Sequence, residues 1–206
     1  VFGSSMSEFV FGYMLFFKKR IRARVLAQRA RQWDNEDGGV LRGKTLGLLG
    51  VGSIGAHLAL TAKHFGMKVK GFTHSSEDCK DVDVYYHNPD ILKFADGLDY
   101  LVSVLPRTEG TNKIVDADLL NALPPQAIFI NVGRGHAVDE SALVDALNNN
   151  QIAGAVLDVT DPEPLPEEHP FWTTPNLFLT FHTSAMSYPE DMVGLFVENY
   201  KLYLEG

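Results

Sequence analysis

The chain has 206 residues, of which 45% are hydrophobic and 21% are charged. A chain of this length and composition can bury a substantial core, which excludes intrinsic disorder and a small disulfide-stapled fold. The single cysteine, Cys79, excludes an intrachain disulfide and a multi-cysteine metal site. Because unpaired cysteine is typical of reducing compartments, we expect a cytoplasmic protein without a metal centre.

The net charge of −8 is unevenly distributed. Residues 1–33 contain seven basic residues and one acidic residue, whereas the rest of the chain carries 11 basic and 25 acidic residues. This acidic body argues against nucleic acid and anionic membranes as partners. The apolar run from Phe9 to Phe17 is too short to span a membrane, which needs about 20 apolar residues, so we expect a buried helix there.

The first segment, residues 1–33, is predicted to form one long helix. Ser5 to Glu8 has the spacing of a capping box, and no proline interrupts the sequence before Trp33. The first half is apolar nearly all round, which fits either an ordinary core helix or packing against a second subunit. Residues 34–43 contain three glycines and three acidic residues, and we expect them to form a linker.

Short apolar runs alternate with helical patterns from Lys44 onwards. This alternation predicts an α/β fold with a doubly wound parallel sheet, a Rossmann-type domain over residues 44–186. A final helix is expected over residues 187–206. The expected strands are Thr45–Leu49, Lys68–Phe72, Tyr100–Leu105, Ala127–Val132, Ala153–Val159 and Leu177–Phe181, and the expected helices between them cover about 54–65, 89–96, 116–122 and 139–149.

A glycine-rich loop follows the first strand. Gly50, Gly52 and Gly55 stand in G-x-G-x-x-G register between an apolar strand and a helix that begins with Ser53 and Ile54. The first glycine permits a tight turn, the second admits a pyrophosphate, and the third lets helix and strand pack closely. The pattern predicts dinucleotide binding at the helix N-terminus; a purely structural glycine turn is the alternative.

The end of the second strand bears on the choice of dinucleotide. A carboxylate about 20 residues after the glycines would bind the ribose 2′-hydroxyl of NAD, but Thr73 occupies that position. Without that carboxylate a 2′-phosphate is not repelled, and Thr73, His74 and Ser75 offer hydrogen bonds to it. We therefore expect NADP in preference to NAD.

Three polar residues follow the ends of three predicted strands: Arg134, Glu163 and His182. The carboxyl ends of parallel strands share one edge of the sheet, where ligands bind. Reduction of a 2-keto acid needs a cation for the carboxylate, a proton donor for the carbonyl oxygen, and a carboxylate that keeps this donor protonated. Arg134, His182 and Glu163 could take these roles in that order.

These motifs together resemble one family, the D-isomer-specific 2-hydroxyacid dehydrogenases. The resemblance covers essentially the whole chain and is strongest to the glyoxylate/hydroxypyruvate reductase branch, whose loop is similar to residues 162–172. It implies that Arg134 binds substrate, that His182 is the acid/base and that Glu163 polarises it. It also implies cofactor contacts from Leu105, Pro106, Val132, Gly133 and, at the nicotinamide carboxamide, Asp158. The motifs that carry it are Arg42–Thr45, Gly50–Gly55, Phe65–Met67, Leu105–Pro106, Asn131–Gly135, Asp158–Pro164 and His182.

The resemblance also implies a larger molecule and a partner. Family members carry a substrate domain before the long helix, most of which this sequence lacks, and the final helix returns towards that domain. The long helix, Glu8 to Trp33, is expected to pair with its mate in a homodimer, and Val1 in place of Met suggests a start other than the native N-terminus. Two alternatives remain: a phosphoglycerate dehydrogenase-like enzyme, and a non-catalytic, corepressor-like protein that senses NAD(P).

The resemblance is not complete at His182, because Phe181 stands where the family usually has proline before the histidine. The remaining histidines have no metal-ligand spacing and are assigned surface or packing roles; they are His57, His64, His87, His136 and His169.

Overall fold

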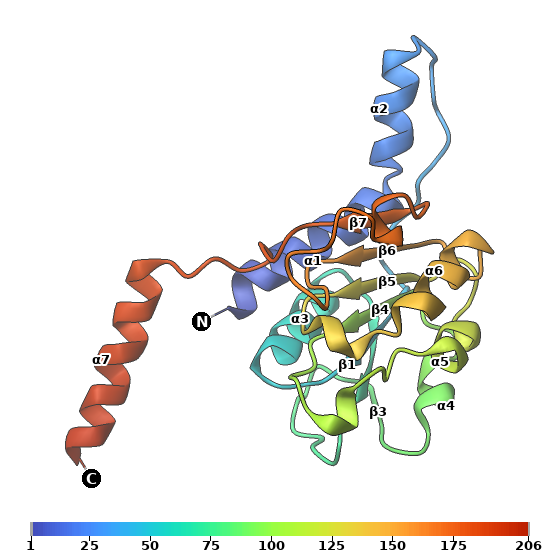
Figure 1. Ribbon diagram of the computed structural model, residues 1–206. Helices are drawn as coiled ribbons and strands as arrows, with labels where there is room; N and C mark the ends of the chain where they lie inside the picture. Colours follow the sequence, from blue (N-terminus) through green and yellow to red (C-terminus); the bar gives the residue numbers. More distant parts are fainter. Residues whose placement is uncertain (1, 206) are drawn as a thin grey trace.

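A computed structural model of the chain describes residues 2–205. Its centre is a seven-stranded parallel sheet with the strand order β3-β2-β1-β4-β5-β6-β7 (Figure 1). This confirms the predicted α/β fold with a doubly wound parallel sheet. The strands are β1 Thr45–Leu49, β2 Lys68–Phe72, β3 Val84–Tyr86, β4 Tyr100–Ser103, β5 Ile128–Asn131, β6 Gly154–Leu157 and β7 Leu177–Leu179.

Helices cover both faces of the sheet. α1 (Gly3–Lys18) and α3 (Ser53–His64) lie on one face, and α4 (Ile91–Ala95), α5 (Ala117–Ala122) and α6 (Glu140–Asn148) lie on the other. Successive strand residues alternate between two buried clusters: Phe129 packs with the second group of helices, and Ile128 and Ile130 pack with the first. Burial on both faces explains why the strands read as continuous apolar runs.

All six expected strands are present, although four of them end earlier than predicted. One strand, β3, was not predicted; it pairs with β2 at the edge of the sheet. β3 has three residues, and Val84 is exposed. A short, half-exposed edge strand lacks the apolar run that marks a central strand.

The prediction of one helix over residues 1–33 is wrong. α1 ends at Lys18, and a second helix, α2, covers Ile21–Arg29. Between them Arg20 adopts the left-handed conformation with φ 53°, and this single residue breaks the helix. The expected capping box is also wrong, because α1 begins at Gly3 and the Ser7 hydroxyl donates to the Gly3 carbonyl within the helix.

α1 packs on its own domain. Val10, Phe11 and Met14 are buried in the core on the α3 side, and Phe16 and Phe17 pack edge-on against Phe178. This face of the apolar segment is therefore buried within the domain, as in a core helix, and packing of the segment against a second subunit stays a prediction.

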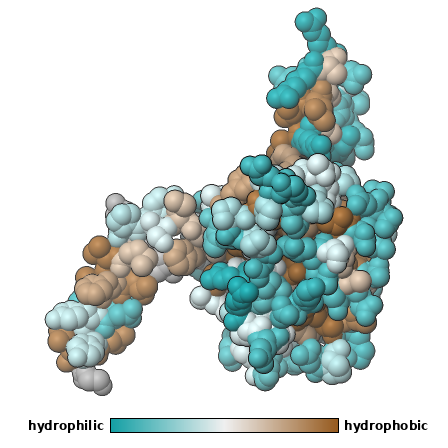
Figure 2. Space-filling view, viewed as in Figure 1, coloured by the Kyte–Doolittle hydropathy of each residue, from teal (hydrophilic) through white to brown (hydrophobic). Residues whose placement is uncertain are grey.

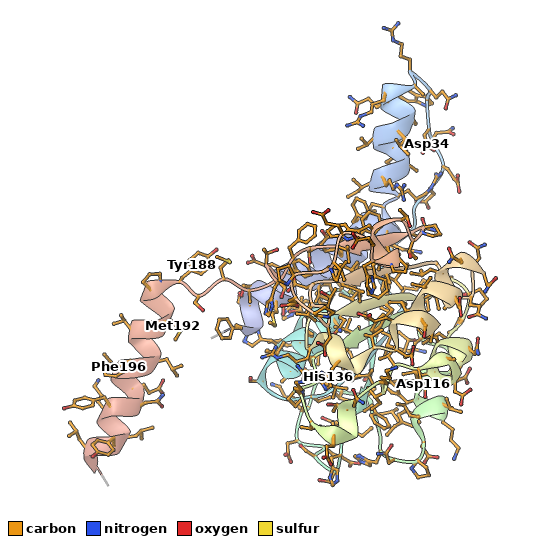
Figure 3. All side chains as sticks on the ribbon, in the orientation of Figure 1. Asp34, Asp116, His136, Tyr188, Met192 and Phe196 are labelled. Carbon is orange, nitrogen blue, oxygen red and sulfur yellow. The ribbon has the colours of Figure 1, made fainter. Side chains whose placement is uncertain are left out.

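Residues 34–43 fold back along α2 (Figure 1). Arg20 forms ion pairs with Asp34 and Glu36, at 3.2 and 2.7 Å, and Arg24 donates to the Glu36 carbonyl. Figure 3 shows Asp34 beside α2. Because of these bonds, α2 and the expected linker form a paired arm that projects from the domain.

The final helix, α7 (Pro189–Glu205), also extends away from the domain, well apart from α2 (Figure 1). Tyr188, Met192 and Phe196 extend into open space (Figure 3), with 56%, 44% and 68% of their surface exposed. Figure 2 shows apolar surface along α7 and on part of α2. Among the described residues, no helix is long and apolar enough to cross a membrane.

Candidate active site

The glycine-rich loop joins β1 to α3 in the geometry that a pyrophosphate requires. Gly50 has φ +94°, which favours glycine, and a Cβ at Gly55 would collide with the Gly50 carbonyl oxygen. A Cβ at Gly52 would meet nothing within 4 Å, so the loop is open there. No side chain caps α3, whose first amides, including those of Ser53 and Ile54, face this opening. The loop therefore fits a dinucleotide phosphate.

At the end of β2, Thr73 begins a turn. Its hydroxyl donates to the Ser76 carbonyl at 2.6 Å, and it also lies 3.3 Å from Nδ1 of His87. His74 and Ser75 are exposed. The sequence analysis gave His87 only a surface or packing role, but the imidazole lies against the Thr73 position and pairs with Glu77.

The loops after β4 and β5 touch each other. A Cβ at Gly133 would lie 2.8 Å from the backbone nitrogen and oxygen of Leu105, so only glycine allows this close approach. Val132 is buried in the core. Leu105 is half-buried beside it, and Pro106 is exposed.

The structure brings Arg134, Glu163 and His182 together around one cavity of about 350 Å³. Nδ1 of His182 lies 2.9 Å from Oε2 of Glu163, and Oε1 of Glu163 accepts a hydrogen bond from the Thr160 amide at 2.9 Å. Burial raises the pKa of the Glu163 carboxyl, but the bonds from His182 and Thr160 outweigh burial, so this pKa lies below its ordinary value.

This pairing defines which nitrogen of His182 is available for chemistry. An ionised carboxylate only accepts hydrogen bonds, so Nδ1 of His182 carries the hydrogen that it shares with Glu163. Nε2 then remains to exchange a proton with a bound molecule. An imidazole with a carboxylate on one nitrogen and a cavity on the other is suited to general acid/base catalysis.

Asp158 anchors the loop that carries His182. Its carboxylate accepts hydrogen bonds from the Thr180 hydroxyl at 2.6 Å and from the amides of Thr183 and Ser184 at 2.8 and 3.1 Å, and only 2% of the residue is exposed. Its carbonyl accepts from the His182 amide at 2.6 Å. These bonds show a positioning function that the sequence analysis did not predict for Asp158.

The backbone conformation before His182 excludes proline. Phe181 and His182 both adopt left-handed backbone conformations, with φ 56° and 58°. Proline is restricted to φ near −65° and could not adopt this conformation. Phe181 also stacks on Trp172, with ring centroids 5.9 Å apart, in the wall of an apolar cavity of about 440 Å³ beside His182.

Two arginines line the cavity that His182 faces. Arg134 donates through Nη1 to the carbonyl of Gly133 at 2.7 Å, and no described carboxylate pairs with it. Arg107, which the sequence analysis missed, forms an ion pair with Asp161 at 3.0 Å across the same cavity. Arg107 directly follows Leu105 and Pro106 in the loop after β4, and this position could have identified it as a site residue. Arg134 therefore remains free to bind an anion.

Within residues 2–205, no group of three or more histidine, cysteine, aspartate or glutamate side chains could hold a metal ion. Cys79 is a free thiol.

A parallel sheet with a glycine loop at the first helix, and with an acid/base pair at the carboxyl edge of its strands, defines a dinucleotide-binding domain of the dehydrogenase type. The family model described as "D-isomer specific 2-hydroxyacid dehydrogenase, NAD binding domain" matches residues 11–184. The chain belongs to this family.

Individual relatives agree with this assignment. The chain is 33% identical over 185 residues to glyoxylate/hydroxypyruvate reductase A of Serratia proteamaculans, covering 90% of the chain and 59% of the relative. A D-isomer specific 2-hydroxyacid dehydrogenase family protein from Aeromonas salmonicida superposes with a TM-score of 0.94 and 42% identity, covering 100% of this chain and 66% of that one. The NADPH-dependent glyoxylate/hydroxypyruvate reductase from Sinorhizobium meliloti, solved with NADP and sulfate, superposes with a TM-score of 0.87 and 30% identity. This match covers 97% of this chain and 64% of that one. The chain thus spans about two thirds of these relatives or less.

Proposed function

We propose that this chain is the cofactor-binding part of a reductase that converts a small 2-keto acid, such as glyoxylate or hydroxypyruvate, into the 2-hydroxy acid. The observation that carries the proposal is the His182–Glu163 pair, which faces the same cavity as the unpaired Arg134. A bound nicotinamide supplies the hydride that this reduction needs. The relatives named as reductases support this substrate class.

Each side chain of the cavity has a separate role in this reaction. Arg134 binds the substrate carboxylate through two parallel hydrogen bonds and so orients the keto group. His182 donates the proton from Nε2 to the carbonyl oxygen of the substrate. Glu163 stabilises the protonated imidazole through Nδ1 and holds its orientation. Asp158 fixes the loop that positions His182.

Cofactor choice follows from the turn after β2. We propose NADP in preference to NAD, because Thr73 replaces the carboxylate that would repel a 2′-phosphate. The complex of the Sinorhizobium meliloti reductase with NADP supports this preference. The contacts proposed for Gly50, Gly52, Ser53, Ile54, Gly55, Thr73, His74, Ser75, Leu105, Pro106, Val132, Gly133 and Asp158 belong to the same proposal.

We also propose a homodimer that uses the arm formed by α2. Ile21, Val25 and Leu26 expose 41%, 41% and 52% of their surface on this short helix, and burying them would stabilise association. Light scattering of the purified protein tests this proposal: Leu26→Glu should give monomers at concentrations where the unaltered protein is dimeric. A cytoplasmic location and the return of α7 to the substrate domain likewise remain predictions.

Steady-state assays with the complete protein test the enzymatic function. His182→Ala should lower kcat for glyoxylate reduction by roughly 100-fold or more, the usual size of general acid catalysis. His64→Ala is the matched control, since His64 lies on the exposed side of α3. A loss below about tenfold would contradict acid catalysis by His182. Turnover of only phosphorylated substrates would favour the phosphoglycerate dehydrogenase alternative, and dinucleotide-dependent peptide binding without turnover would favour the corepressor-like one.

A further inference from the structure

His87 and Glu77 form a pair beside Thr73, the position expected to contact the ribose of the dinucleotide. His87 follows β3 and Glu77 lies in the loop between β2 and β3. Nδ1 of His87 lies 3.0 Å from the Thr73 carbonyl oxygen, and Nε2 lies 2.9 Å from Oε1 of Glu77. Thr73 is the residue that replaces the carboxylate expected in NAD-binding proteins, so His87 contacts this position directly.

The two hydrogen bonds define the charge on His87. A carbonyl oxygen only accepts, so Nδ1 must carry a hydrogen, and an ionised carboxylate also only accepts, so Nε2 must carry one as well. An imidazole with hydrogens on both nitrogens is the cation. The pKa of His87 is accordingly raised, first by the hydrogen bond to Glu77 and then by the bond to Thr73.

Glu77 is the charged group that stabilises the protonated form of His87. On the β2 side the ring meets the carbonyl and hydroxyl of Thr73, which carry no charge. On the α4 side Asp90 is paired with Lys93 at 2.7 Å. Glu77 is 61% exposed in its side chain, so a phosphate in solution can compete with it for Nε2 of His87.

We propose that His87 and Glu77 select between the 2′-phosphorylated and the unphosphorylated dinucleotide. With His87 protonated, the 2′-phosphate replaces Glu77 as the partner of Nε2, and NADP is favoured. Once His87 loses its proton, the Glu77 carboxylate remains alone near Thr73 and repels the phosphate. This inference rests on the proposed binding of a dinucleotide at the glycine loop, and it makes the preference for NADP fall as pH rises.

Titration of the complete protein with NADPH and with NADH, followed by cofactor fluorescence between pH 6 and 9, tests the inference. At pH 6 the unaltered protein should bind NADPH roughly tenfold more tightly than His87→Gln does, which is the size of one charge-assisted hydrogen bond. This advantage should disappear towards pH 9. NADH affinity should be the same in both proteins and serves as the internal reference for folding.

The variant also removes a confounding effect. The 2′-phosphate itself titrates with a pKa near 6, so only the difference between the unaltered protein and His87→Gln reports on His87. Glu77→Gln should bind NADPH more tightly than the unaltered protein at high pH, because the carboxylate that repels the phosphate is gone. The pH at which NADPH affinity falls should also be lower in this variant, because His87 loses the carboxylate that holds its proton. His64→Gln on α3, where no carboxylate among the described residues contacts the ring, should change the affinity for neither cofactor.

The outcomes separate the two proposals. If neither NADPH nor NADH binds, the proposed function fails. If both bind but His87→Gln and the unaltered protein show the same pH dependence for NADPH, the selection by His87 is wrong. If His87→Gln does not fold, an unchanged pH midpoint in Glu77→Gln overturns the inference.

Discussion

His182 and Glu163 are joined by a 2.9 Å hydrogen bond although they belong to loops that follow different strands, β7 and β6. The two strands are neighbours in the sheet and run parallel, so their carboxyl ends lie side by side. This adjacency places the histidine–carboxylate pair at the edge where the glycine loop also lies.

Glu163→Gln tests the electrostatic part of this pair. The amide still contacts the imidazole but no longer stabilises its positive charge, so we expect kcat for keto-acid reduction to fall by roughly 100-fold. Glu167→Gln, in the same loop and exposed, is the control, and an unchanged kcat in Glu163→Gln would argue against the pairing. In the unaltered protein the lowered pKa of Glu163 keeps the pair intact until the pH falls below the usual carboxyl range.

The two arginines of the cavity should differ in their effect on substrate binding. Arg134→Lys loses the planar guanidinium that pairs with a carboxylate, so KM for glyoxylate should rise by at least about tenfold. Arg107→Lys should change KM by less than about threefold, because Arg107 is already paired with Asp161. Initial-rate measurements over a range of glyoxylate concentrations give both values, and equal effects would show that Arg107 shares in carboxylate binding.

Asp158→Ala should destabilise the domain. The buried carboxylate accepts hydrogen bonds from Thr180, Thr183 and Ser184, and hydrogen bonds to a charged group contribute about 1.5–3 kcal/mol each. We expect a loss of about 3 kcal/mol in the free energy of unfolding, measured by urea denaturation. Thr180→Val, which removes one of these donors, should cost about 1.5 kcal/mol, the lower end of that range. A loss below that control in Asp158→Ala would contradict the anchoring role.

Asp139 should make the stability of the domain depend on acid pH. It begins α6, where it accepts hydrogen bonds from the Ser141 hydroxyl and the Ala142 amide and pairs with Lys113. These contacts lower the pKa of Asp139 to about 2. A carboxyl whose pKa is lowered by folding stabilises the protein above its ordinary pKa, and this stabilisation is lost as pH falls towards the lowered value.

Asp139→Ala should therefore cost about 1 kcal/mol near neutral pH, as loss of a helix cap does. The difference from the unaltered protein should shrink as pH falls from about 4 to about 2. Urea denaturation at several pH values measures it. Asp145→Ala, at an exposed position within α6, should change stability by less than about 0.5 kcal/mol at every pH.

Much of the fold could be predicted from local patterns. The central strands are buried on both faces, so each appears in the sequence as an uninterrupted apolar run. The glycine spacing around Gly52 is dictated by backbone geometry that few other residues adopt. Arg134, Glu163 and His182 could be grouped before any coordinates, because parallel strands bring their carboxyl ends to one edge.

Other features depend on contacts between segments that are distant in the chain. The helix break at Arg20 is stabilised by Asp34 and Glu36, and the pattern of residues 1–33 contains no sign of it. Arg107 meets Asp161, and His87 meets Thr73 and Glu77, only after β2, β3, β4 and β6 are assembled. Hydropathy and spacing report which residues are buried and which strands form. Pairings between polar side chains leave no periodic signal, because their geometry arises from the packing of the whole sheet.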